Sequence, residues 1–148
     1  MYWACFAASG PGRLVKVEGT MDKHQYVDIL ENNLKVSARE LNLGRRWSFV
    51  QDNDSKHTSK LATSWFKNNK IKVLEWPAQS PDLNPMENLW RKFKLKVMER
   101  KPSNIKQLDE VCQEEWKNLS VDECTRLVEN YQKRLREVLA RKGYTIDY

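Results

Sequence analysis

The chain has 148 residues, and its 26 Lys and Arg against 20 Asp and Glu give a formal net charge of +6. Hydrophobic residues make up 40% of the sequence and there are six Trp, a composition that excludes a disordered chain. No apolar run approaches the roughly 20 residues that a membrane helix needs, so we expect no membrane partner, and the basic balance favours a polyanion.

The first half of the sequence alternates strand and helix patterns. A hairpin is expected around the turn signal Gly10-Pro11-Gly12, and a helical stripe follows that Gly44 should end. The expected elements are, in chain order, a strand at Met1–Phe6, a strand at 14–17, a helix at Met21–Leu43, a strand at Trp47–Val50, a short helix at Leu61–Phe66 and a strand at Ile71–Trp76.

Beyond Pro77 the pattern becomes helical. An irregular loop with two prolines, Ser80–Pro85, precedes a helix that should begin at Asn84 with Pro85 in its first turn. Two more helices are expected over residues 104–117 and 121–141. The order of elements predicts an α/β domain that closes with helices.

Positive charge is concentrated in the first half. Residues 1–74 hold 12 basic and 7 acidic residues, a net +5, whereas residues 75–148 hold 14 and 13, a net +1. Basic stretches separated by an acidic helix fit a groove for a phosphate backbone, but they also fit ordinary solvated helix faces.

Two carboxylates occupy positions in the predicted elements where they could bind a metal ion. Asp52 follows a predicted strand, and Glu87 falls in the first turn of a predicted helix, so both could meet at one edge of the sheet and hold a hard cation such as Mg²⁺. The alternatives are structural. Asn84 and Glu87 fit a capping box, and Asp52 to Asp54 fit a turn that opens the next helix.

Two long motifs resemble those of the Tc-one/mariner transposases, with the Sleeping-Beauty-like branch most similar. QDNDSKHTS at Gln51–Ser59 resembles their Q-D-N-D-P-K-H-T-S motif, and WPAQSPDLNPMENLW at Trp76–Trp90 resembles W-P-x-Q-S-P-D-L-N-P-I-E-N-L-W. The 34 residues between Asp52 and Glu87 match the family spacing of the second and third acids. The segments Trp3–Gly10 and Cys112–Trp116 also resemble the family, so the resemblance covers nearly the whole chain.

The resemblance implies a ribonuclease-H-like DDE core in which three acids hold two Mg²⁺ or Mn²⁺ ions for DNA cleavage and strand transfer. Asp52 matches the second catalytic, metal-binding acid and Glu87 the third. Asn53, Asp54, Lys56 and His57 match the motif around Asp52, where Ser55 replaces the usual Pro. We expect DNA contacts from a set of polar and basic side chains, Asn53, Lys56, His57, Arg91 and Lys94.

In the family the first Asp lies on a central strand ahead of the strand at Met1–Phe6, and no residue here matches it. No segment resembles the helix-turn-helix domains. We therefore expect residues 1–148 to be a truncated catalytic domain without its first central strand, with strands and helices over 1–76 and the helix of Glu87 and the closing helices over 84–142. The expected partners are double-stranded DNA in the nucleus, and a second copy or a full-length transposase.

Two alternatives remain open. The chain could cleave DNA with Asp22 or Glu18 as a substitute acid, or together with a full-length partner. It could instead be a domesticated DNA- or protein-binding module without enzyme activity.

Overall fold

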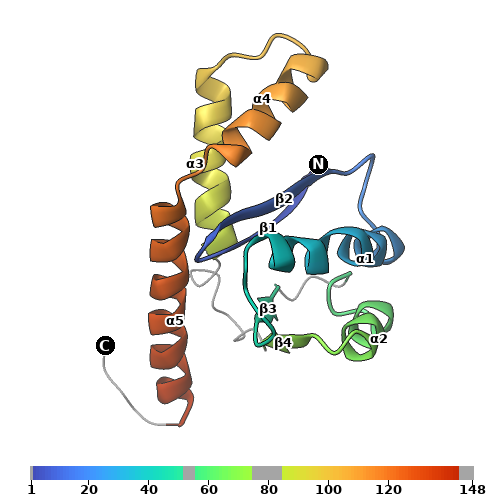
Figure 1. Cartoon of the computed structure of the whole chain (residues 1–148), viewed down its shortest axis with the longest axis vertical. Coiled ribbons are helices and arrows are strands. Elements are labelled where there is room, and N and C mark those ends of the chain that lie inside the picture. The colour runs from blue at the N-terminus through green and yellow to red at the C-terminus, as the bar shows by residue number, and fades with distance from the viewer. Residues whose placement is uncertain (1, 52–55, 75–84, 144–148) are drawn as a thin grey trace. The chain divides into compact units, whose positions relative to one another are not determined.

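The computed structural model describes residues 2–51, 56–74 and 85–143, and the chain divides into two units (Figure 1). Unit 1 comprises residues 1–5 and 12–78, and unit 2 comprises residues 6–11 and 79–148. Unit 1 contains two small sheets and two helices, and unit 2 contains three helices and the tip of a hairpin. The expected order of strands first and helices last is therefore confirmed.

The hairpin consists of β1 (Tyr2–Ala7) and β2 (Gly10–Lys16), joined by two residues. The prediction that Gly10-Pro11-Gly12 forms the turn was wrong, because these residues begin β2. Gly12 has a packing role, since a Cβ there would lie 2.7 Å from Cys5 Sγ and 2.8 Å from the Cys5 carbonyl oxygen. Gly10 has a φ of 139°, which side chains disfavour, and Pro11 is tolerated because each strand of a two-stranded sheet is an edge strand.

Helix α1 (Lys23–Glu40) begins with a capping box. The Asp22 carboxylate accepts from the Gln25 N–H at 2.8 Å, and the Gln25 side chain accepts from the Asp22 N–H at 3.0 Å. The helix ends before Gly44, contrary to the prediction, because Asn42 adopts the left-handed conformation with φ 56°. The Leu43 N–H then bonds to the Ala38 carbonyl at 3.1 Å, which satisfies an orphan acceptor of the last turn.

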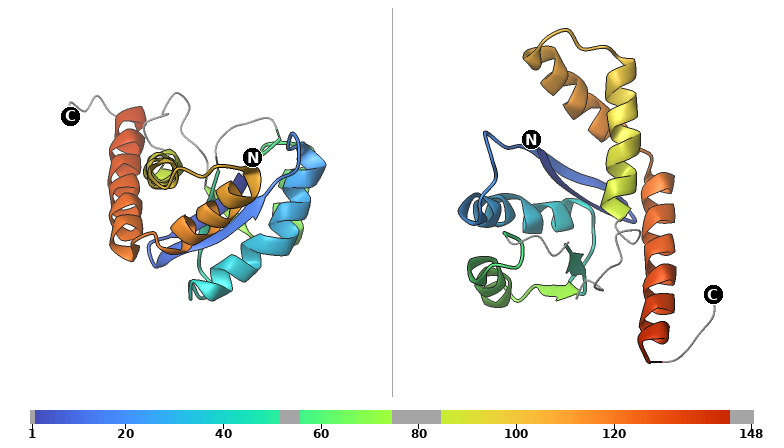
Figure 2. Two further views of the ribbon diagram at one scale, coloured as in Figure 1. Left: turned by 90° about the horizontal axis from the view of Figure 1, so that it is seen from above. Right: turned by 180° about the vertical axis from the view of Figure 1, so that it is seen from behind.

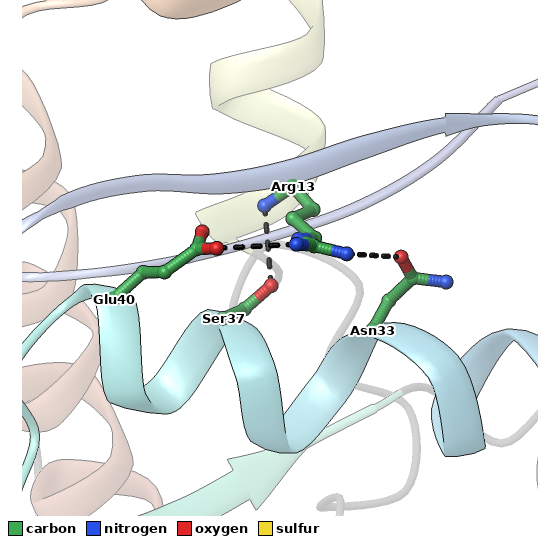
Figure 3. A network of polar contacts seen from close by, with 4 residues as sticks. All are labelled: Arg13, Asn33, Ser37 and Glu40. Carbon is green, nitrogen blue, oxygen red and sulfur yellow. Dashed lines mark hydrogen bonds and ion pairs between the residues drawn. The ribbon is translucent and has the colours of Figure 1, made fainter.

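Arg13 of β2 ties the hairpin to α1 (Figure 3). Its backbone N–H donates to the Ser37 hydroxyl at 3.3 Å, and its guanidinium lies 3.5 Å from Asn33 Oδ1 and 3.2 Å from Glu40 Oε1. Ser37 is buried, so its hydroxyl needs this backbone partner. These contacts fix one face of α1 against the hairpin.

The second sheet pairs β3 (Ser48–Val50) with β4 (Lys72–Leu74) in parallel, with Phe49 opposite Val73. Helix α2 (Lys60–Asn68) lies in the connection between the two strands, which is long enough for the crossover that parallel strands need. Within the described ranges, β1–β2 and β3–β4 are separate two-stranded sheets.

One apolar core holds unit 1 together, drawn from the hairpin and from helices α1 and α2. Its buried members include Tyr26, Leu30 and Phe66, and the side chains of Phe49 and Val73 pack against it from the parallel sheet. Burial of α1 along this stripe explains why the apolar period predicted the helix.

Unit 2 contains α3 (Pro85–Glu99), α4 (Ile105–Lys117) and α5 (Val121–Gly143). Pro85 is the first residue of α3, as predicted. Helix α4 folds back along α3, and α5 packs against α3 as well (Figures 1 and 2). Trp90, Phe93 and Trp116 form an aromatic cluster with ring centroids 5.5–5.6 Å apart.

The tip of the hairpin belongs to unit 2 through α5. The Thr125 hydroxyl donates to the Ala8 carbonyl at 2.6 Å, which satisfies an acceptor of the turn. One residue earlier, burial raises the pKa of the Cys124 thiol to about 11, with Glu123 adding to the effect. No described helix is long and apolar enough to cross a membrane.

Candidate active site at the carboxyl edge of β3

The segment with the predicted second acid follows β3 directly. Gln51 is the first residue after the strand, and Asp52, Asn53, Asp54 and Ser55 lie outside the described residues. The predictions for Asp52 and Asn53 therefore remain predictions. What the structure does describe is how the chain is held on either side of this segment.

Tyr26, Gln51 and His57 contact one another, an arrangement we name the Tyr26–Gln51–His57 clamp. The Tyr26 hydroxyl donates to Gln51 Oε1, and Gln51 Nε2 donates to the His57 carbonyl oxygen at 2.9 Å. The rings of Tyr26 and His57 stack with centroids 4.4 Å apart. The Gln51 amide thus links the residue that follows β3 to His57, on the other side of the acidic segment in the sequence, and to α1 through Tyr26.

The sequence analysis missed the first two members of this clamp. It assigned Tyr26 only to the apolar stripe of a helix, and it used Gln51 only as a letter of a motif. The available signal was the Tyr26 hydroxyl, because a tyrosine whose side chain is 1% exposed needs a hydrogen-bond partner for its oxygen.

The start of α2 fixes the far end of the same loop. Ser59 is the N-cap, since its hydroxyl oxygen accepts from the Ala62 N–H at 3.2 Å and donates to the Lys56 carbonyl at 3.1 Å. Lys56 and His57 are both half-buried. Their proposed DNA contacts are untested, and the structure gives their backbones a structural role as well.

Glu87 lies in the first turn of α3, where a carboxylate complements the helix dipole, and its side chain is exposed. Leu89, Phe93 and Val97 are buried and fix the orientation of this helix in unit 2. Asn84 lies outside the described residues, so the capping-box alternative is not tested. The meeting of Asp52 and Glu87 also remains a prediction.

Arg91 and Lys94 follow Glu87 by four and seven residues, which places all three on one face of α3. Both cations are exposed, whereas Lys92 on another face lies 3.8 Å from Glu123. The predicted DNA-contacting cations of α3 are therefore available to solvent beside Glu87.

The described residues contain no group of three His, Cys, Asp or Glu side chains that could hold a metal ion. Asp22, considered as a substitute acid, is occupied as the N-cap of α1. Glu18 is exposed in the connection after β2. Within the described residues, neither Asp22 nor Glu18 belongs to a group that could hold a metal ion, and the metal-binding roles of Asp52 and Glu87 stay predictions.

Comparisons with known proteins identify the family and the fold. Residues 3–109 match the model of the DDE superfamily endonuclease family. The chain is 40% identical over its whole length to the transposable element Tcb1 transposase of Caenorhabditis briggsae, and 34% identical to the transposable element Tc1 transposase of Caenorhabditis elegans. It spans 54% of the length of each of these relatives.

The fold is similar to solved structures of the Mos1 transposase catalytic domain. One structure, solved with raltegravir and Mg, superposes with a TM-score of 0.77 at 20% identity and covers 97% of this chain and 75% of that one. A Mos1 paired-end complex with the left transposon end gives a TM-score of 0.74 at 20% identity, over 95% of this chain and 42% of that one. The fold is thus the ribonuclease-H-like fold of the DDE enzymes, and the chain belongs to the DDE superfamily of endonucleases.

Proposed function

We propose that this chain forms the Asp52- and Glu87-bearing part of a cut-and-paste DNA transposase, and that these two carboxylates act on a phosphodiester of bound DNA. The observation that supports this most directly is the Tyr26–Gln51–His57 clamp. It joins Gln51, at the carboxyl end of a parallel strand pair, to His57, and these residues flank Asp52 in the sequence. The carboxyl ends of strands are where ligands collect in α/β sheets.

The donor chemistry of the two acids suits Mg²⁺ or Mn²⁺, since hard cations take carboxylate oxygens. Asp52 and Glu87 would hold the metal, which supplies activation of the attacking water and neutralisation of charge on the phosphate when bound. Support for metal use comes from the family, whose Mos1 member has been solved with Mg and with Mn.

The residues around the acids would bind and orient DNA. Arg91 and Lys94 share a face of α3 with Glu87 and would attract the phosphate backbone toward it. Lys56, His57 and Asn53 would contact DNA beside Asp52. The clamp would keep Asp52 in place while the DNA is bound.

As a 148-residue polypeptide the chain should bind DNA and fail to cleave it. Two acids of a three-acid family site are matched by the two motifs, and no residue of the sequence matches the first. The expected partners are double-stranded DNA in the nucleus and a second copy or a full-length transposase, and a Mos1 relative has been solved as a paired-end complex with a transposon end.

A plasmid assay with MgCl₂ or MnCl₂ tests both statements. Bound plasmid should stay supercoiled, and Arg91→Gln with Lys94→Gln should weaken binding more than the matched pair Lys106→Gln with Lys117→Gln on α4. Nicking that disappears in both Asp52→Ala and Glu87→Ala would contradict the expected inactivity. Absence of DNA binding by the unmodified polypeptide would contradict the proposed role.

A further inference from the structure

Unit 1 contains a basic hollow at the edge of β3 and β4 opposite to the clamp. Its volume is about 610 Å³, and ten residues of unit 1 line it: Lys35, Ala38, Arg39, Asn42, Gly44, Arg45, Trp47, Asn69, Lys70 and Ile71. Trp47 directly precedes β3, and Ile71 directly precedes β4. Since a three-residue strand is roughly 10 Å long, the hollow is a separate place from the segment of Asp52.

Four cations line this hollow, and no carboxylate does. The side chains of Lys35, Arg39, Arg45 and Lys70 are all exposed. In the part of the chain that the structure describes, none of the four forms an ion pair with a carboxylate. Unpaired cations in a concave surface make a strongly positive local potential.

The acids of α1 do not line the hollow. Glu40 pairs with Arg13, and Glu31 accepts from the indole N–H of Trp65. Glu31 and Asp28 precede Lys35 by four and seven residues, so they share its face of the helix, but they lie one and two turns nearer the start of α1. Lys35 and Arg39 lie in the last two turns, beside the hollow.

The C-termini of α1 and α2 lie near the hollow, and their partial negative charge disfavours an anion there. Each helix C-terminus carries about half a negative charge, which makes roughly one for the two helices against four full positive charges. The last carbonyls are also bonded internally, as in Ile71 N–H to Phe66 O at 2.9 Å and Leu43 N–H to Ala38 O at 3.1 Å. The cations therefore dominate the hollow.

We propose that this hollow binds the phosphate backbone of a DNA strand. A lipid surface fits poorly, because Leu61 is the exposed large hydrophobic residue described in unit 1, and interfacial binding needs an apolar face. A small apolar ligand fits poorly too, because six of the ten lining residues are Lys, Arg or Asn. Trp47 adds an aromatic surface on which a sugar or an unpaired base can rest, as single-strand sites use.

This inference rests on the proposed function and adds a second DNA contact to it, away from the reacting phosphodiester. Bound here, DNA would be held at two edges of the parallel pair. The cleaved segment would lie at the carboxyl edge, and a more distant stretch of the same or another strand would lie in the hollow.

Fluorescence anisotropy on the 148-residue protein tests the inference, with labelled single-stranded and duplex oligonucleotides titrated at several salt concentrations. Arg39→Gln with Arg45→Gln should weaken binding roughly tenfold or more near 0.1 M salt and reduce the salt slope by about two. The matched control removes two exposed cations of α2 that do not line the hollow, Lys60→Gln with Lys67→Gln. Equal effects of the two pairs would overturn the proposal.

A further variant and a second ligand distinguish DNA binding in the hollow from unfolding and from unspecific binding of polyanions. Lys70→Gly removes a cation from a left-handed position that favours glycine, so it should weaken binding without unfolding the protein. A heparin fragment should lose less affinity than DNA in the Arg39→Gln, Arg45→Gln variant, and equal losses would overturn the assignment to DNA. If the unmodified protein binds no DNA, the proposed function fails; if it binds with an unchanged salt slope in the variant, only this inference fails.

Discussion

The two units reach stability by different routes. Unit 2 is built from three long helices around an aromatic cluster, so much of its packing joins neighbouring elements of the chain. Unit 1 has two separate two-stranded sheets, and the strands of the parallel pair are three residues long. Two-stranded sheets are marginal alone, so unit 1 depends on a shared core and on long-range polar contacts such as those of Arg13 and Gln51.

The largest effect should come from removing a ring of the aromatic cluster in unit 2, which tests whether the two units are stabilised separately. Trp116 is 2% exposed and contacts the rings of Trp90 and Phe93, so Trp116→Ala should lower the free energy of unfolding of unit 2 by about 3–5 kcal/mol. Hydrogen exchange should show lost protection in α3 to α5, while α1 and α2 keep theirs.

Met98→Ala is the matched control in the same unit, because this side chain is 72% exposed, and its effect should stay within about 0.5 kcal/mol. Equal loss of protection in α1 after Trp116→Ala would show that the two units unfold together. The two units would then be separate in their contacts but would unfold as one cooperative unit.

In unit 1 the most sensitive position should be the close approach of the two hairpin strands. Gly12→Ala places a methyl group 2.8 Å from the Cys5 carbonyl oxygen, which cannot move without shifting β1, so we expect a loss of about 1–3 kcal/mol. Gly19→Ala meets no atom within 4 Å and should leave the hairpin amides protected despite its φ of 68°. Undiminished protection of β1 in Gly12→Ala would contradict this explanation.

A smaller effect is expected at the clamp. Tyr26→Phe removes the hydroxyl that Gln51 Oε1 accepts from, and it should cost about 1 kcal/mol. Combined with Gln51→Ala in a double-mutant cycle, the two losses should not add, because each variant breaks the same network. Additive losses in chemical denaturation would show that the clamp does not act as a unit.

These residues also show where sequence reasoning succeeds. The apolar period predicted α1 and the order of elements, and two motifs predicted the family, because periodicity and local motifs are written in neighbouring residues. The ends of elements were predicted less well. Gly10-Pro11-Gly12 has turn composition but pairs in a strand, because the hairpin turns earlier, at Ala8 and Ser9, and Gly12 then lies close to Cys5 of β1.

The candidate site divides in the same way. Asp52 and Glu87 could be proposed from the two motifs, yet the contacts of Gln51 beside Asp52 could not, because the Tyr26–Gln51 contact joins residues 25 positions apart. The basic hollow was equally hidden. Its cations come from α1, the following loop and the end of α2, and only the folded chain brings them together.

The smallest effect we predict concerns the ends of α1 and α2, which use the same motif with different residues. Asn42 and Lys70 both adopt left-handed φ values, 56° and 57°, but lysine tolerates this conformation less well than asparagine. Lys70→Gly should therefore raise the free energy of unfolding by about 0.5–1 kcal/mol, and Asn42→Gly by less.

Lys70→Ala is the control for the side chain, since it keeps the strained backbone and should leave stability nearly unchanged in thermal unfolding. No gain from Lys70→Gly would contradict the strain argument. A gain in stability together with weaker DNA binding would mean that a lysine is retained in a left-handed position for its charge. That pairing of results would separate a cation placed for binding from one that merely ends a helix.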